Sequence, residues 1–117
     1  MDDKLELIWP EKEVLITLPP LKIGKKVYRN LVHFFRQPNA EDKKIYIENL
    51  TDEKLSALAR TIQANITLYD RCALRIEGYI VPEGMDWKAA LWPEHKSMAA
   101  TRLLERYGVF TGEMQKN

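Results

Sequence analysis

The side chains best suited to catalysis or metal binding in this sequence are His33, His95 and Cys72. The two histidines are 62 residues apart and have no cysteine close by, so they do not form a zinc-ligand spacing. We expect His33 on a helix surface or half-buried, and His95 in the first turn of the last helix. Cys72 lies at the edge of an apolar stripe, where we expect nothing local to lower the pKa of its thiol. A buried, structural cysteine is therefore expected rather than a nucleophile.

Other catalytic signatures are missing from the sequence. It has no glycine-rich phosphate loop and no G-x-S-x-G nucleophile motif. Asp52 and Glu53 suit the positive end of a helix dipole better than an acid–base pair. Asp70 and Glu77 recur at a spacing of seven, which indicates a solvated helix flank, with a metal site between helices as the open alternative. We expect a protein that is not an enzyme and that uses no cofactor or metal.

The basic side chains in the middle of the chain are the main candidate for a binding surface. Residues 22–44 hold seven basic and two acidic residues, whereas residues 1–21 hold two basic and five acidic ones. Contacts from such a face to phosphates give affinity without sequence recognition. The candidate nucleic-acid-binding residues are Lys22, Lys25, Lys26, Arg29, Arg36, Lys43 and Lys44. The alternative is a solvated surface that balances the acidic N-terminal segment.

The first half of the chain is expected to combine strands and one helix. Alternating apolar residues predict strands at residues 4–8 and 13–18, which form a β-hairpin over residues 1–20. A broad apolar stripe predicts a helix over residues 24–37, ended by Pro38. Residues 42–50 fit either a third strand or a short helix capped by Asn39, and we favour a helix or irregular structure over the strand.

A long helix is predicted over residues 51–80. Thr51 suits its N-cap, and apolar residues then recur at alternating intervals of four and three, as in a heptad repeat. These residues are Leu55, Ala59, Ile62, Ile66, Tyr69, Ala73, Ile76 and Ile80. Such a helix is roughly 40 Å long, which exceeds the width of an ordinary domain of this size. We therefore expect the stripe to contact a second copy of the chain or a helical protein partner, with the chain's own helices as the alternative.

Two shorter helices are predicted over residues 86–107. Asp86 is the candidate cap of the first, and Pro93 suits the first position of the second. The face expected to be buried consists of Ala99, Ala100, Leu103, Leu104 and Tyr107. Trp87 and Trp92 flank the first of these helices, where they either anchor the last helices or mark a partner surface.

The segment WKAALWPEHKSMAATRLLERYGVF, residues 87–110, resembles the C-terminal part of some phage terminase small subunits. The matching positions are His95, Lys96, Ala99, Ala100, Leu103, Leu104 and Gly108. The resemblance implies a non-catalytic, ring-forming protein that recognises viral DNA and passes it to a large ATPase subunit. A helical hairpin that builds such a ring would correspond to residues 51–80. That family usually begins with a helix-turn-helix, whereas this chain begins with a predicted hairpin, so residues 22–44 would have to bind the DNA.

Length and composition indicate one globular domain over residues 1–117. The apolar and charged fractions are those of a folded rather than a disordered protein. No stretch approaches the roughly 20 apolar residues of a membrane span. The segment MDDKLELIWP lacks the apolar run of a secretory signal. We therefore expect a cytoplasmic protein with no membrane partner.

The sequence thus predicts a mainly helical (α+β) fold, in which an N-terminal β-hairpin packs on a helical bundle with one long central helix. The expected function is that of a non-catalytic phage or prophage adaptor, similar to a terminase small subunit. It would oligomerise through the long helix and bind double-stranded DNA through the basic face. The alternative is a protein-binding module without nucleic acid, such as a phage assembly chaperone or a small regulatory adaptor. An enzyme with a carboxylate or histidine site in a helical bundle is the third alternative.

Overall fold

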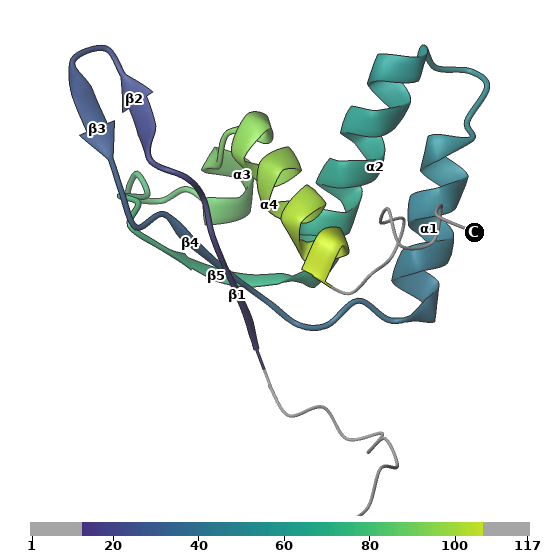
Figure 1. Cartoon of the computed structure of the whole chain (residues 1–117), viewed down its shortest axis with the longest axis horizontal. Helices are drawn as coiled ribbons and strands as arrows, with labels where there is room; N and C mark the ends of the chain where they lie inside the picture. The colour runs from purple at the N-terminus through teal and green to yellow at the C-terminus, as the bar shows by residue number, and fades with distance from the viewer. Residues whose placement is uncertain (1–12, 107–117) are drawn as a thin grey trace, which may run out of the picture.

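The computed structural model describes residues 13–106 of the chain. In chain order the elements are β1 (Val14–Thr17), β2 (Leu21–Ile23), β3 (Lys26–Tyr28), β4 (Val32–Phe35), α1 (Ala40–Leu50), α2 (Ala57–Cys72), β5 (Ala73–Glu77), α3 (Trp87–Ala90) and α4 (Pro93–Arg106). Figure 1 shows the helices on one side of the β1, β4 and β5 strands, with β2 and β3 extending beyond them.

β1, β4 and β5 form one antiparallel sheet with β4 in the middle. The register places Ile16 opposite His33, and His33 opposite Ile76, so these three side chains point to the same face. Phe35 lies on this face as well, and its ring meets the ring of Tyr69 on α2 edge to face at 5.3 Å. The core of the protein therefore lies between this face of the sheet and the helices α2 and α4.

β2 and β3 form a separate two-stranded hairpin. We call residues 21–29 the arm, because they extend away from the sheet (Figure 1). The two-residue turn between Ile23 and Lys26 begins at Gly24, whose φ of 63° lies in the left-handed region that glycine adopts without strain. Leu21 packs against the core and so attaches the base of the arm to the body of the protein.

The predicted helix over residues 24–37 is wrong. These residues form the turn of the arm, β3 and β4. Asn30, between the two strands, has a φ of 60°, which a right-handed helix does not allow. The apolar run of residues 31–35 fits a strand buried on both faces as well as a helical stripe, and pairing with β1 and β5 decides in favour of the strand.

The predicted continuous helix over residues 51–80 is also wrong. Thr51 ends α1 instead of starting the next helix, and its hydroxyl donates to the backbone carbonyl of Ile47. α2 begins only after Ser56, whose hydroxyl accepts a backbone hydrogen bond from the first turn. α2 ends at Cys72, and the chain continues directly into β5, which pairs with β4. Strand pairing therefore overrides the helical spacing of the apolar residues beyond α2.

These two corrections change the fold class. The protein is not a hairpin packed on a helical bundle with one long central helix. It is an α+β fold, in which a three-stranded antiparallel sheet carries its helices on one face. β1 lies where the second strand was predicted and pairs with β4, whereas the predicted strand at residues 4–8 lies outside the described residues.

Local predictions elsewhere agree with the structure. The alternative left open for residues 42–50 is settled in favour of a helix, α1, and the Asn39 side chain caps it by accepting from the backbone N–H of Asp42. α3 and α4 fall within the predicted C-terminal helices, and Pro93 is the first residue of α4. Residue 107, the last of the predicted range, lies outside the described residues.

Candidate functional site

The seven basic residues predicted to bind nucleic acid do not form one surface. Four of them are exposed on the arm: Lys22, Lys25, Lys26 and Arg29. Lys43 and Lys44 lie on α1, which is at the far end of the molecule from the arm in Figure 1. Arg36 follows β4 and is held by an acidic side chain of its own chain. The structure therefore leaves the arm as the concentrated part of the predicted basic face.

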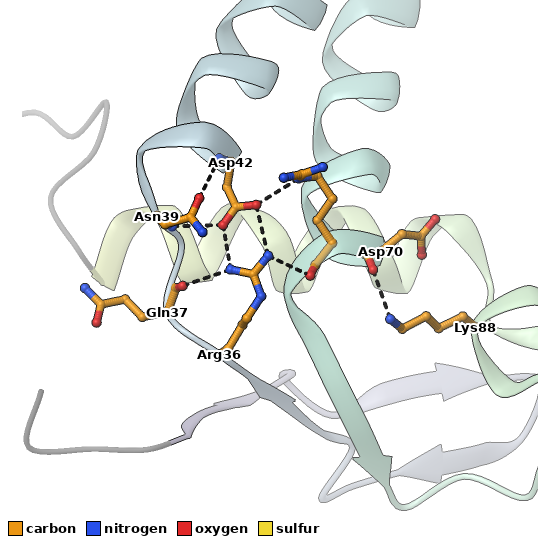
Figure 2. Close-up of polar contacts among 7 residues, drawn as sticks. Arg36, Gln37, Asn39, Asp42, Asp70 and Lys88 are labelled. Carbon is orange, nitrogen blue, oxygen red and sulfur yellow. Dashed lines mark hydrogen bonds and ion pairs between the residues drawn. The ribbon is translucent and has the colours of Figure 1, made fainter.

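Arg36 belongs to a polar cluster that joins β4, α1 and α2 (Figure 2). Its Nη1 and Nη2 donate to the two carboxylate oxygens of Asp42 at 2.6 and 3.0 Å. Arg71 donates from Nε to the same carboxylate at 2.8 Å, and the backbone N–H of Asn39 donates to it at 2.8 Å. Burial alone would raise the pKa of Asp42, but these donors outweigh it and hold that pKa well below its ordinary value. Arg36 thus has a structural role at the start of α1.

The eight residues predicted to form one interface are also divided by the structure. Ala59, Ile62, Ile66 and Tyr69 lie on α2, Ala73 and Ile76 on β5, and Leu55 and Ile80 outside these elements. Tyr69 is completely buried within this chain, so it is not available to a partner. Ile80, by contrast, is 99% exposed in the segment that follows β5. The continuous stripe on which the predicted interface depended therefore does not exist.

A groove of about 580 Å³ lies between the arm, the segment that follows β5, and helices α3 and α4. Ile23 and Tyr28 line it from the arm, and Ile80, Met85 and Trp92 line it from the other side. These five side chains are 40% to 99% exposed, which is unusual for apolar side chains gathered in one place. None of the lining residues carries a charge at neutral pH. The groove is therefore an apolar surface that the described part of the chain leaves uncovered.

A chain of four hydrogen-bonded rings forms part of the groove wall and continues beneath it. His33 on β4 is completely buried and contacts two tyrosine hydroxyls. Its Nδ1 lies 2.7 Å from the hydroxyl of Tyr69, and its Nε2 lies 2.8 Å from the hydroxyl of Tyr79. The Tyr79 hydroxyl lies 3.0 Å from Nδ1 of His95 on α4. We call these four residues the relay; Tyr79 and His95 also line the groove.

One arrangement of protons satisfies the whole relay with every ring neutral. Tyr69 donates its O–H to Nδ1 of His33, and His33 donates its Nε2–H to the hydroxyl oxygen of Tyr79. Tyr79 then donates its own O–H to Nδ1 of His95. The hydroxyls of Tyr69 and Tyr79, both ring nitrogens of His33 and Nδ1 of His95 thus have partners inside the protein.

Burial shifts the titration of the relay so that its members stay neutral. It lowers the pKa of His33 to about 4, with a smaller effect from His95. It also lowers the pKa of His95, against an opposing effect of Glu94. Burial raises the pKa of Tyr79 to about 12 and raises that of Tyr69 further. No relay residue is therefore shifted toward the range in which acid–base catalysts work at neutral pH.

The expectation for His33 is wrong, because it lies on the inner face of β4 and not on a helix surface. Cys72 is buried as expected, and burial raises the pKa of its thiol to about 12. Trp87 packs against the core, whereas Trp92 is half-exposed with its ring 5.1 Å from that of His95. Trp87 thus has the anchoring role considered for the two tryptophans, whereas a partner surface at Trp92 stays a prediction.

Sequence reasoning missed most of the groove. Ile80 was placed on a helical interface, and the groove residues between it and α3 carried no motif. The groove forms only when the arm, the segment after β5 and α4 meet, and these segments are far apart in the sequence. The one usable signal was the pair of tryptophans beside α3.

No family model, curated protein or solved structure matches this chain. No helix within residues 13–106 is long and apolar enough to cross a bilayer. Within the same residues, no three histidine, cysteine, aspartate or glutamate side chains gather where they could hold a metal ion. The function therefore has to be inferred from the groove and the arm.

Proposed function

We propose that this protein is a non-catalytic adaptor that binds an apolar segment of a partner protein in the groove. The observation that carries this proposal is the gathering of exposed apolar side chains around an uncharged groove of about 580 Å³. Of the roles that the sequence left open, this one corresponds to the protein-binding module, such as a phage assembly chaperone or a small regulatory adaptor.

The exposed apolar side chains of the groove would contribute favourable free energy to binding. Ile80 is 99% exposed, and Met85 and Trp92 are each about half exposed. Covering these three side chains would contribute on the order of 4 kcal/mol to binding, from the usual value for apolar surface removed from water. Tryptophan, the residue at position 92, is enriched among the residues that dominate the binding energy of interfaces.

Selection of peptides tests this proposal directly. A library of short random peptides displayed on phage is selected on the immobilised protein, and enriched peptides are synthesised and titrated by calorimetry. The double variant Ile80→Glu/Met85→Glu places two charges in the groove and is expected to weaken binding by at least about tenfold. Leu58→Glu is the matched control, because Leu58 is 72% exposed but lies on α2 outside the groove. Equal affinities for wild type and the groove variant would refute the proposal.

The charge of the arm favours a second candidate function, the binding of double-stranded DNA. Lys22, Lys25, Lys26 and Arg29 are all exposed on one projecting hairpin. A two-stranded ribbon of this kind fits the major groove of DNA, and its cations can contact the phosphates. This is the activity that the resemblance to terminase small subunits implies.

Fluorescence anisotropy with a short labelled duplex tests DNA binding. The affinity is expected to fall steeply as salt rises, and Lys25→Gln/Lys26→Gln is expected to weaken it and to reduce the salt dependence. Lys43→Gln/Lys44→Gln on α1 removes the same charge at the far end of the molecule and serves as the control. If the two double variants lose the same amount of affinity for DNA, the arm is not a specific DNA contact.

A further inference from the structure

We propose that the partner segment carries acidic residues beside its apolar part, and that these acidic residues contact the arm. This inference rests on the proposed function, because it specifies the chemistry of the segment that the groove binds. The observation behind it is a neutral, apolar groove that is bordered on one side by a strip of positive charge.

The register of the arm places one of its cations on the groove side. Ile23 lies opposite Lys26 across the β2–β3 ladder, and Tyr28 lies two residues beyond Lys26 on β3, so the three side chains share a face. Ile23 and Tyr28 line the groove. Lys26 therefore lies on the face of the arm that borders the groove, whereas Lys22, next to Ile23, lies on the opposite face.

The cations of the arm have no acidic neighbours along the chain. They are Lys22, Lys25, Lys26 and Arg29, and residues 18–40 contain no aspartate or glutamate. No ion pair within residues 13–106 engages any of these four side chains. Arg36 and Arg71, in contrast, share the carboxylate of Asp42. An acidic residue on a partner would therefore meet positive charge that no acidic side chain within residues 13–106 pairs with.

Two acidic side chains at the border that the segment after β5 forms give the partner segment a direction. Glu83 and Asp86 are exposed in the turn on either side of Met85, and Met85 lines the groove. Acidic residues of a partner would be repelled from this border, since like charges brought together at an interface are unfavourable. The acidic part of the segment therefore lies toward the arm and its apolar part toward Ile80 and Trp92.

A nucleic acid matches the arm but not the groove beside it. Phosphates would pair with the cations, yet a nucleic acid on the arm alone would leave Ile80, Met85 and Trp92 exposed to water. A peptide with adjoining acidic and apolar parts covers both surfaces at once. The position of the apolar groove directly beside the basic arm thus favours a protein segment over DNA.

The peptide selection distinguishes this inference from the proposed function. The same library is selected on wild type, on Lys26→Gln and on Ile80→Glu/Met85→Glu. We expect wild type to enrich apolar runs with aspartate or glutamate at one side, and Lys26→Gln to enrich fewer acidic residues beside the same runs. Apolar runs without an excess of acidic residues would overturn this inference and leave the proposed function standing. No enrichment on wild type beyond that on the groove variant would overturn both.

Binding kinetics then test the contact between Lys26 and the acidic residues. For an enriched acidic peptide, Lys26→Gln is expected to lower the association rate constant roughly two- to fivefold at low salt, because charges at the rim of an interface act mainly on association. Lys22→Gln removes the same charge from the opposite face of the arm and is expected to have a smaller effect. Thermal unfolding of both variants checks that they fold as wild type does.

Two results would refute the proposed contact between Lys26 and the acidic residues of the partner. If the Lys22 and Lys26 variants lower the association rate constant equally, the effect comes from net charge and not from a contact between Lys26 and the peptide. Binding of a short DNA duplex that Lys26→Gln weakens and Ile80→Glu/Met85→Glu leaves unchanged, with no competition from the acidic peptide, would assign the arm to nucleic acid.

Discussion

The buried position of His33 predicts that the protein loses stability in mild acid. In the folded protein, burial lowers the pKa of His33 to about 4 from an ordinary value of 6.5. The unfolded chain binds a proton at this histidine below about pH 6.5, whereas the folded protein does not until about pH 4. The stability due to the neutral His33 is therefore fully present above about pH 6.5, declines as the pH falls, and is lost near pH 4.

The size of this effect follows from the shift in pKa. A shift from 6.5 to about 4, at about 1.4 kcal/mol per pH unit, corresponds to roughly 3 kcal/mol of unfolding free energy. This is a large fraction of the stability of an ordinary domain. His95 contributes in the same direction, because burial lowers its pKa as well.

Unfolding by urea at a series of pH values, with and without the substitution His33→Gln, measures the contribution of His33. Glutamine does not titrate, and its amide can donate to one tyrosine hydroxyl and accept from the other. We expect the variant to be less stable than wild type at neutral pH, and the difference to shrink by about 3 kcal/mol on going to about pH 4. His95→Gln, which leaves His33 in place, is the control for the second histidine. Parallel stability curves for wild type and His33→Gln would refute the reasoning.

Two further substitutions test the contacts that hold the groove and α1 in place. Gly78→Ala is expected to cost more than about 2 kcal/mol in urea unfolding, because Gly78 has a φ of 92° and an added Cβ would lie 2.4 Å from the backbone oxygen of Asn30. Gly84 also has a positive φ, but no atom lies close to the position of an added Cβ. An equal loss of stability in Gly84→Ala would therefore contradict the role of the contact at Gly78. Asp42→Asn is expected to cost roughly 2 kcal/mol at neutral pH, because it removes the charge that two partly exposed arginines share. If circular dichroism shows that the Asp42→Asn variant melts at the same temperature as wild type, that reasoning is wrong.

The features that the sequence predicts correctly are those set by neighbouring residues. Asn39 caps α1 through a hydrogen bond to the backbone N–H of Asp42, three residues away. Pro93 starts α4 because its missing N–H is not needed in the first turn. The charge of the arm is also visible, since it follows from the composition of a single short segment.

The boundary between α2 and β5 could not be predicted in the same way. Apolar residues continue beyond Cys72 at intervals that fit a helix, so the local pattern contains no stop signal. The chain leaves the helix because β4 offers a strand with which Ala73 and Ile76 can pair. The sequence pattern predicts a helix for that strand as well, over residues 24–37, so the pairing partner of β5 is not apparent from the sequence.

The relay could not be predicted because its members come from four separate segments of the chain. His33 lies on β4, Tyr69 on α2, Tyr79 after β5 and His95 on α4. Each residue taken alone fits an ordinary place in a helix or strand. Only the packing of the sheet against α2 and α4 brings their polar atoms within hydrogen-bond distance.

Three consecutive residues show how the fold anchors one wall of the groove. Gly78 lies so close to the backbone of Asn30, at the base of the arm, that no larger residue fits. Tyr79 is tied to the core through hydrogen bonds to His33 and His95. Ile80 follows directly and is 99% exposed. The backbone that presents Ile80 is thus anchored by the two residues before it, and an anchored backbone lowers the entropic cost of binding at that position.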